Sequence, residues 1–221
     1  MSSISIYAWN PKRLVPGDSR NPLSPLRWAY GNFGDLYNFD LVRWFYGQNA
    51  TSNLSGSRAF FVGSTLHKAR HSDLIAGAGV KEPRRKTTVN PQNILGVRGP
   101  LTRDYLLTRF GALPNLRFLG DPGVLASDVY KSNKSVRELH DYTLIPHYRD
   151  RVHWLNFGVP VERLVSPDNP PSYVYSQITE SKLVITSSLH GMVFAHSAGV
   201  PVVLVKPIFE STFKYLDYLG S

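Results

Sequence analysis

The sequence contains no cysteine among its 221 residues. Disulfide scaffolds, thiolate metal sites and cysteine nucleophiles are therefore excluded. No apolar run approaches the roughly 20 residues that a membrane-spanning helix needs. The first residues, Met1 to Tyr7, lack the basic and apolar segments of a signal peptide, so we expect a cytoplasmic protein.

Acidic residues are also scarce, since 16 Asp and Glu stand against 25 Lys and Arg and give a formal net charge of +9. This balance favours an anionic partner, such as a phosphorylated small molecule, an acidic glycan or a lipid surface. The charge is not gathered in one tail and no nucleic-acid-binding motif is present, so we expect no nucleic acid partner. The nucleophile elbow, the P-loop and the His-Glu-x-x-His zinc motif are absent too, and we predict no metal site.

Short apolar runs alternate with amphipathic stretches along the chain. We expect strands at residues 4–9, 59–62, 74–76, 93–97, 116–119, 142–145, 163–165, 182–186 and 202–205. We expect helices at residues 35–46, 99–107, 171–181, 190–198 and 211–219. This alternation predicts an α/β fold with parallel sheets covered on both faces. Residues 10–28 hold four prolines and are expected to form an irregular surface loop.

The polar stretch 130–141 divides the chain and is the expected linker. We therefore predict two Rossmann-like parallel-sheet domains, residues 1–130 and 140–221. Ligands of such folds bind beyond the carboxyl ends of the strands, and here we expect them in the cleft between the two domains.

The most informative segment joins an apolar strand to a helix that begins at His190. Ser187, Ser188 and Leu189 form the turn between them. The free N–H groups and the positive dipole at a helix N-terminus favour phosphate or carboxylate. His190 adds a proton carrier that works near neutral pH, so we favour a functional over a structural role for this histidine.

Other charged side chains follow predicted strands in the same way. Arg98 either pairs with an acid at the sheet edge or clamps a carboxylate or phosphate with its guanidinium. Asp121 follows the strand at 116–119, and His147 follows the strand at 142–145.

The stretch from Gly31 to Asp35, Gly-Asn-Phe-Gly-Asp, leads into the first predicted helix. Asp35 either caps this helix or acts as a general base. Asn32 and Asp35 can also bind the hydroxyl groups of a sugar. Tyr30 is one of several nearby aromatic residues that either stack on a sugar face or pack in the core.

Together these motifs resemble the polysaccharide pyruvyl transferase family, most closely its ketal-pyruvate transferases that act on bacterial exopolysaccharides. The matching motifs are Asn32–Asp35, Ala76–Gly79, Leu95–Thr102, Gly120–Gly123, Ile145–Tyr148, Ser187–Gly191 and Phe213–Tyr218. The resemblance implies a GT-B-like pair of domains with the active site in the interdomain cleft. It also implies transfer of the enolpyruvyl carbons of phosphoenolpyruvate to two hydroxyls of one sugar, which gives a pyruvate ketal and releases phosphate. Phosphoenolpyruvate is then the donor substrate, and no cofactor is implied.

The resemblance further implies that Arg98 and His190 contact phosphoenolpyruvate, with Lys214, or alternatively Lys206, as a further cation. Ser187, Ser188, Leu189 and His147 complete the predicted donor site. Many family members carry arginine where this chain has Ser188, and His147 or Arg149 can replace that charge. The chain also stops soon after the motif that contains Lys214, so we expect a shortened C-terminal domain.

A mechanism fits these residues, with His190 as the general acid that protonates the methylene carbon of phosphoenolpyruvate. Asp35 or Asp121 is the expected base, and Asn32, Asp35 and Tyr30 are the expected acceptor-binding residues. We expect an oligosaccharide or lipid-linked oligosaccharide as acceptor, with peripheral association at the inner membrane face. The alternative is a GT-B-type glycosyltransferase that uses a nucleotide sugar.

Overall fold

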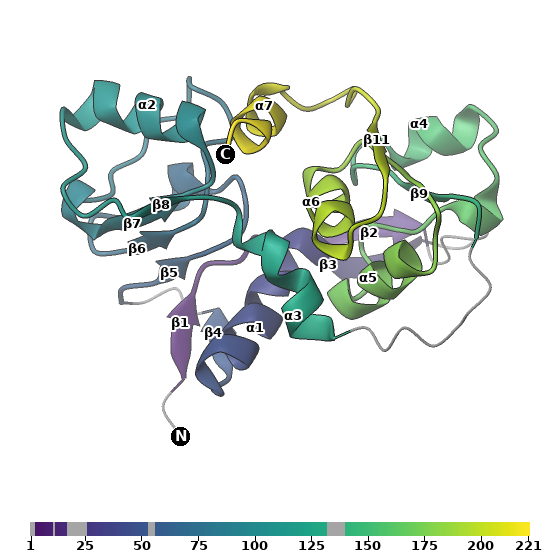
Figure 1. Ribbon diagram of the computed structural model, residues 1–221, viewed down its shortest axis with the longest axis horizontal. Helices are drawn as coiled ribbons and strands as arrows, with labels where there is room; N and C mark the ends of the chain where they lie inside the picture. The colour runs from purple at the N-terminus through teal and green to yellow at the C-terminus, as the bar shows by residue number, and fades with distance from the viewer. Residues whose placement is uncertain (1–2, 11, 17–25, 53–55, 132–139) are drawn as a thin grey trace. The chain divides into compact units, whose positions relative to one another are not determined.

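The computed structural model describes residues 3–10, 12–16, 26–52, 56–131 and 140–221. Within them the chain forms two compact units (Figure 1). Unit 1 contains Met1–Trp9, Tyr37–Pro122 and Ser211–Ser221, and unit 2 contains Asn10–Leu36 and Gly123–Glu210. Both units are thus built from more than one stretch of chain, whereas the domains expected at 1–130 and 140–221 are continuous. Those limits stay a prediction.

Unit 1 is built on a six-stranded sheet whose order is β4-β1-β5-β6-β7-β8. Its strands are β1 (Ile4–Ile6), β4 (Ala50–Ser52), β5 (Ala59–Phe60), β6 (Leu74–Ala76), β7 (Ile94–Val97) and β8 (Phe118–Leu119). Every neighbouring pair is parallel, so all the carboxyl ends of these strands lie at one edge. This edge is where ligands of parallel α/β sheets bind.

Three α-helices contribute to unit 1: α1 (Phe33–Tyr46), α2 (Pro100–Phe110) and α7 (Phe213–Leu219). The first turn of α1, up to Leu36, belongs to unit 2. Short 3₁₀ turns lie at η1 (Leu66–Lys68) and η2 (Pro91–Asn93). Pro100 suits the first turn of α2 because its missing N–H would have no partner there, and Gly111, with φ 78°, ends the helix. The helices α2 and α7 pack side by side (Figure 1). The core beneath them is apolar and includes Phe60, Ile75 and Ile94.

Unit 2 contains a three-stranded parallel sheet with the order β11-β10-β9. Its strands are β9 (Thr143–Ile145), β10 (Val184–Thr186) and β11 (Val202–Leu204). Its helical segments are η3 (Pro122–Leu125), which begins at the last residue of unit 1, α3 (Ala126–Tyr130), α4 (Arg151–Asn156), η4 (Val161–Arg163), α5 (Pro171–Thr179) and α6 (Leu189–Ala198). The first seven residues of α6 are buried, as expected for an apolar helix that packs against α3, α5 and the sheet.

The prediction of an α/β fold with parallel sheets is confirmed, and the two main sheets fit a Rossmann-like arrangement. The prediction of an irregular loop at 10–28 is wrong, because β2 (Lys12–Pro16) and β3 (Leu26–Tyr30) form an antiparallel pair. Pro16 is tolerated because β2 pairs, within the described residues, only with β3 in a two-stranded sheet, and an edge strand accepts a residue without an N–H group. Residues 17–25 lie outside the described part of the chain.

A second correction concerns the strand predicted at 163–165. The structure has η4 there, and Leu164 forms only a single bridge with Leu144. The strand β4 and the short helices α3 and α4 were not predicted, since none shows a clear periodic pattern. Most of the linker predicted at 130–141 lies outside the described residues. None of the described helices is both long and apolar enough to cross a membrane.

Candidate functional site

The predicted strand-end residues of unit 2 meet at the carboxyl edge of its sheet. β9 and β10 are parallel neighbours, so His147, just after β9, and Ser187, just after β10, come together. The backbone N–H of His147 donates a hydrogen bond to Ser187 Oγ over 2.8 Å. The Ser187 hydroxyl therefore ties the two strand ends to each other, which fixes the turn from which α6 begins.

The turn itself is held by Thr186, the last residue of β10. Its hydroxyl donates to the carbonyl of Ile145 over 2.6 Å and accepts from the N–H of Ser188 over 2.9 Å. Ser188 is the N-cap of α6, but its side chain makes no capping hydrogen bond. The positive end of α6 is thus not filled by its own N-cap side chain, so this end suits an anionic ligand.

His190, in the first turn of α6, is buried against the first turn of α1. Only 8% of its surface is exposed, and its ring meets the ring of Phe33 edge-on at 6.4 Å. A Cβ at Gly34 would overlap the Nδ1 and Cγ atoms of His190. Glycine at position 34 therefore lets the helix backbone approach the imidazole directly.

Asn32, rather than Asp35, caps α1. Its Oδ1 accepts hydrogen bonds from the backbone N–H groups of Gly34 at 3.1 Å and Asp35 at 3.3 Å. Its Nδ2 donates to Asp35 Oδ2 over 2.5 Å. The Asp35 carboxylate is therefore not consumed as a helix cap, and it is held in the same turn that contacts His190.

A charged cluster borders the turn on the side of β9. The side chain of Glu210 is 1% exposed and lies 3.9 Å from His147 Nε2 and 3.7 Å from the guanidinium of Arg149. The Arg149 side chain is 49% exposed, and its Nε donates to the hydroxyl of Tyr148 over 3.1 Å. Arg149 thus supplies a solvent-facing positive charge two residues from His147, at the strand end that Ser187 holds.

In unit 1, Arg98 is fully buried and bonded to protein groups. Its Nε donates to Asp217 Oδ2 over 2.9 Å, and its two terminal nitrogens donate to Ser64 Oγ over 2.6 Å and to the carbonyl of Val80 over 2.7 Å. The alternative that Arg98 pairs with an acid is confirmed. Its contact with phosphoenolpyruvate stays a prediction.

Asp121 and Lys214 also belong to unit 1, and both are buried. Asp121 follows β8, and Lys214 Nζ lies 5.1 Å from the ring centre of Tyr215. Burial, assisted by the negative charge of Asp121, raises the pKa of Tyr218 to about 12. The Tyr218 hydroxyl therefore keeps its proton throughout the physiological pH range.

The structure thus divides the predicted residues between the two units. In unit 2 it brings together Asn32, Asp35, His147, Ser187, Ser188, Leu189 and His190. Arg98, Asp121 and Lys214 lie in unit 1, whereas the alternative cation Lys206 is exposed in unit 2. Tyr30 ends β3, and its side chain lies outside the described part of the structure.

The residues of these sites that were not predicted include Thr102, Glu210 and Asp217. Thr102 and Asp217 stand inside the motifs Leu95–Thr102 and Phe213–Tyr218. The sequence therefore marked both positions as part of the family pattern, but it did not show that the two residues bond to each other. Glu210 follows β11 in an irregular stretch with no such signal. No group of three or more His, Asp or Glu side chains in the described ranges is placed to hold a metal ion.

The sequence matches one protein-family model and two known proteins. The family model described as polysaccharide pyruvyl transferase matches residues 14–207. The "Uncharacterized protein L143" of Acanthamoeba polyphaga mimivirus is 29% identical over 178 residues, which cover 72% of this chain and 58% of that protein. The succinoglycan biosynthesis protein ExoV of Rhizobium meliloti (strain 1021) is 26% identical over 209 residues, which cover 89% of this chain and 64% of that protein.

The chain therefore spans about three fifths of the length of these two relatives. No solved structure matches it.

Proposed function

Because the chain belongs to the polysaccharide pyruvyl transferase family, we propose that it forms a cyclic pyruvate ketal on a sugar with phosphoenolpyruvate as the donor. The observation that carries this proposal is the contact between His190 and Gly34. It sets a proton carrier at the N-terminus of α6, directly beside the turn that holds Asn32 and Asp35. The two adjoining helix starts thus supply an anion site and an acid from α6 and a carboxylate from α1.

The donor site is proposed at the start of α6. Phosphoenolpyruvate carries a phosphate and a carboxylate, and the N-terminus of a helix stabilises either group. Arg149 and His147 add charge or hydrogen-bond donors beside Ser187. They are our candidates for the cation that Ser188 does not provide. Arg98 and Lys214 remain predicted ligands on the strength of the family resemblance, as does the GT-B-like arrangement with a site in the interdomain cleft.

His190 is the proposed general acid. It gives a proton to the methylene carbon of phosphoenolpyruvate while an acceptor hydroxyl adds to the central carbon. The C–O bond to phosphate then breaks and phosphate leaves with the electron pair. A second hydroxyl attacks the same carbon to close the ketal and gives its proton to the departing phosphate. One phosphate is released for each ketal formed, and no electrons are gained or lost.

Asp35 is the proposed base that takes the proton of the attacking hydroxyl. Its carboxylate is buried, it is held by Asn32, and it lies next in sequence to the glycine that contacts His190. Acid and base are then set by two facing helix starts of one unit, which is a rigid way to position a proton-transfer pair. Asp121 in unit 1 is the alternative base.

The acceptor is proposed to be an oligosaccharide of an exopolysaccharide precursor, since the relative ExoV is a succinoglycan biosynthesis protein. A donor test separates this proposal from the rival nucleotide-sugar glycosyltransferase. We expect phosphoenolpyruvate to raise the thermal unfolding midpoint, because a ligand at 100 times its Kd stabilises a protein by about 2.7 kcal/mol. Nucleotide sugars should leave the midpoint unchanged. A rise with a nucleotide sugar and none with phosphoenolpyruvate would favour the rival.

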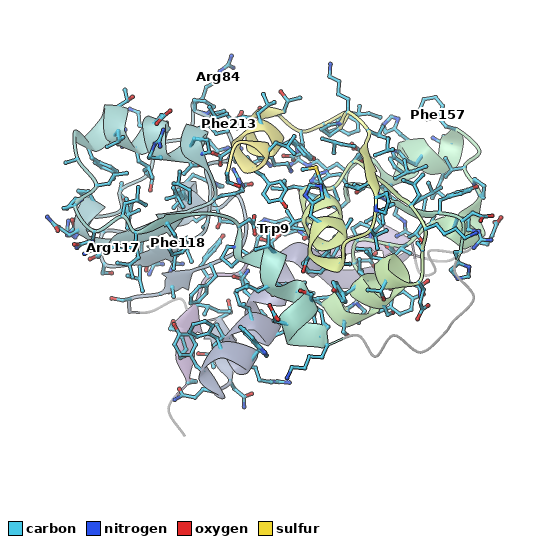
Figure 2. The ribbon with its side chains drawn as sticks, in the orientation of Figure 1. Trp9, Arg84, Arg117, Phe118, Phe157 and Phe213 are labelled. Atoms are coloured by element: carbon cyan, nitrogen blue, oxygen red, sulfur yellow. The ribbon has the colours of Figure 1, made fainter. Side chains whose placement is uncertain are left out.

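A lipid-linked acceptor and peripheral membrane association are part of the same proposal. Arg84, Arg85 and Lys86 are exposed in one loop of unit 1, and Arg84 projects outward (Figure 2). Basic side chains near an anionic lipid surface each contribute about 1 kcal/mol to binding.

We therefore expect the protein to sediment together with vesicles that contain phosphatidylglycerol. A variant in which Arg84, Arg85 and Lys86 are replaced by glutamate should no longer bind these vesicles. Vesicles of phosphatidylcholine alone are the control. Equal binding of the natural protein and the glutamate variant to anionic vesicles would show that this loop does not contact the membrane.

A further inference from the structure

The buried carboxylate of Asp217 joins two parts of unit 1 that are far apart in sequence. Its Oδ2 accepts hydrogen bonds from Arg98 Nε at 2.9 Å and from the Thr102 hydroxyl at 2.6 Å. Its Oδ1 accepts from the backbone N–H of Thr102 at 2.7 Å. We call Arg98, Thr102 and Asp217 the α7 anchor, because they bind α7 to the end of β7 and the first turn of α2.

Backbone packing around the α7 anchor is equally close. A Cβ at Gly99 would overlap the carbonyl oxygen of Asp217, and one at Gly220 would lie 2.9 Å from the ring of Pro100. A Cβ at Gly79 would overlap the guanidinium of Arg98. The arginine and the helix it holds are thus fitted between glycines on both sides, so α7 has little freedom to tilt while the anchor is intact.

The helix α7 has only seven residues, too few to be stable on its own. Its position therefore depends on its tertiary contacts. Lys214 lies three residues before Asp217, which puts the two side chains on neighbouring positions of the same helix surface. Lys214 is buried although it is a lysine, so its place is set by the packing of α7.

We propose that Asp217 is a positioning residue, which holds Lys214 in place for phosphoenolpyruvate through Arg98 and Thr102. Besides its predicted contact with the donor, Arg98 then also supports the donor site through α7, as the partner of Asp217. This inference rests on the proposed function for its ligand, and on the hydrogen bonds of Asp217 for its mechanism. Loss of Asp217 or Thr102 should therefore weaken donor binding, although neither residue contacts phosphoenolpyruvate itself.

The chain offers a matched control in a second buried Arg–Asp pair of unit 1. Asp73 accepts from Arg58 NH2 at 2.6 Å and Nε at 3.3 Å, and both side chains are buried. Burial alone would raise the pKa of Asp73, but the hydrogen bonds from Arg58 and the N–H of Arg70 outweigh it and hold that pKa below its ordinary value. Asp73→Asn therefore leaves a buried arginine without its counter-charge, as Asp217→Asn does, but away from α7.

The test measures how fast Lys214 is acetylated by acetic anhydride, followed by mass spectrometry of the peptides. In Asp217→Asn, α7 should open more often, and the rate at Lys214 should rise at least about tenfold. In Asp73→Asn the rate at Lys214 should stay within about twofold of the natural protein. The exposed Lys182 serves as the internal reference.

Thr102→Val removes a single hydroxyl from the α7 anchor and keeps every charge. It should raise the acetylation rate at Lys214 by a few-fold. If Asp217→Asn does not fold, Thr102→Val tests the positioning role in its place. An unchanged rate in Thr102→Val and in a folded Asp217→Asn, or an equal rise in Asp73→Asn, would overturn the positioning role.

The Kd for phosphoenolpyruvate is measured in parallel, and it should rise about tenfold in Asp217→Asn and not in Asp73→Asn. If the natural protein binds no phosphoenolpyruvate, the proposed function fails while the acetylation result still decides whether Asp217 positions Lys214. If the natural protein binds phosphoenolpyruvate but the acetylation rate at Lys214 is the same in Asp217→Asn as in the natural protein, only the positioning role fails.

Discussion

His190→Ala is expected to lower kcat for pyruvyl transfer by about 10²–10⁴, the usual contribution of a positioned general acid. The imidazole sits at the start of α6 and against the backbone of Gly34, and the proposal gives it the proton for the methylene carbon. His190→Gln is the better-matched variant, because an amide fills part of the space and cannot exchange a proton near neutral pH. Both variants should keep their circular dichroism spectrum.

His196→Ala is the control for this experiment, since His196 lies in the last turn of the same helix and is exposed. It should leave kcat within about twofold of the natural value, as expected for an exposed residue away from the site. Full activity in His190→Gln, or an equal loss in His196→Ala, would show that the proton comes from elsewhere.

Gly34→Ala has the second-largest expected effect. In an ordinary helix this change is favourable by about 1 kcal/mol. Here the new methyl group would overlap the ring of His190, so either the two helix starts separate or the imidazole moves. We expect a loss of about 1–3 kcal/mol in the free energy of unfolding. We also expect a fall in kcat/KM of about 10²-fold, because a displaced acid no longer reaches the reacting carbon.

Gly120→Ala is the matched control for stability, because an added Cβ at position 120 meets no atom within 4 Å and the backbone there is not left-handed. Urea unfolding and initial rates measure both effects. Stability and activity equal to those of the natural protein in Gly34→Ala would mean that the contact between Gly34 and His190 is not needed.

The strand-end rule explains why part of the site could be predicted. Ser187 and His147 follow strands that are now seen as parallel neighbours, and parallel strands bring their carboxyl ends to one edge. The contact of His190 with Gly34 could not be predicted in the same way. It depends on the packing of α1 against α6, which no local pattern encodes.

Arg98 shows where the sequence left a real choice. A buried arginine after a strand suits an ion pair as well as an anion clamp, and the acid that decides the matter, Asp217, stands 119 positions further along the chain. The antiparallel pair of β2 and β3 was missed because one local feature was given too much weight. Proline content predicted a loop, but Pro16 ends its strand and does not interrupt the pairing.

The most direct test of the account is the mass of the product. The purified protein is incubated with phosphoenolpyruvate and lipid-linked oligosaccharides extracted from cells that lack the gene, and the released glycans are analysed by mass spectrometry. We expect one glycan to gain the mass of pyruvate less one water, with one phosphate released for each such product. His190→Gln should give neither the product nor the phosphate. Glycans that are unchanged with phosphoenolpyruvate but gain a sugar from a nucleotide sugar would contradict the proposed function.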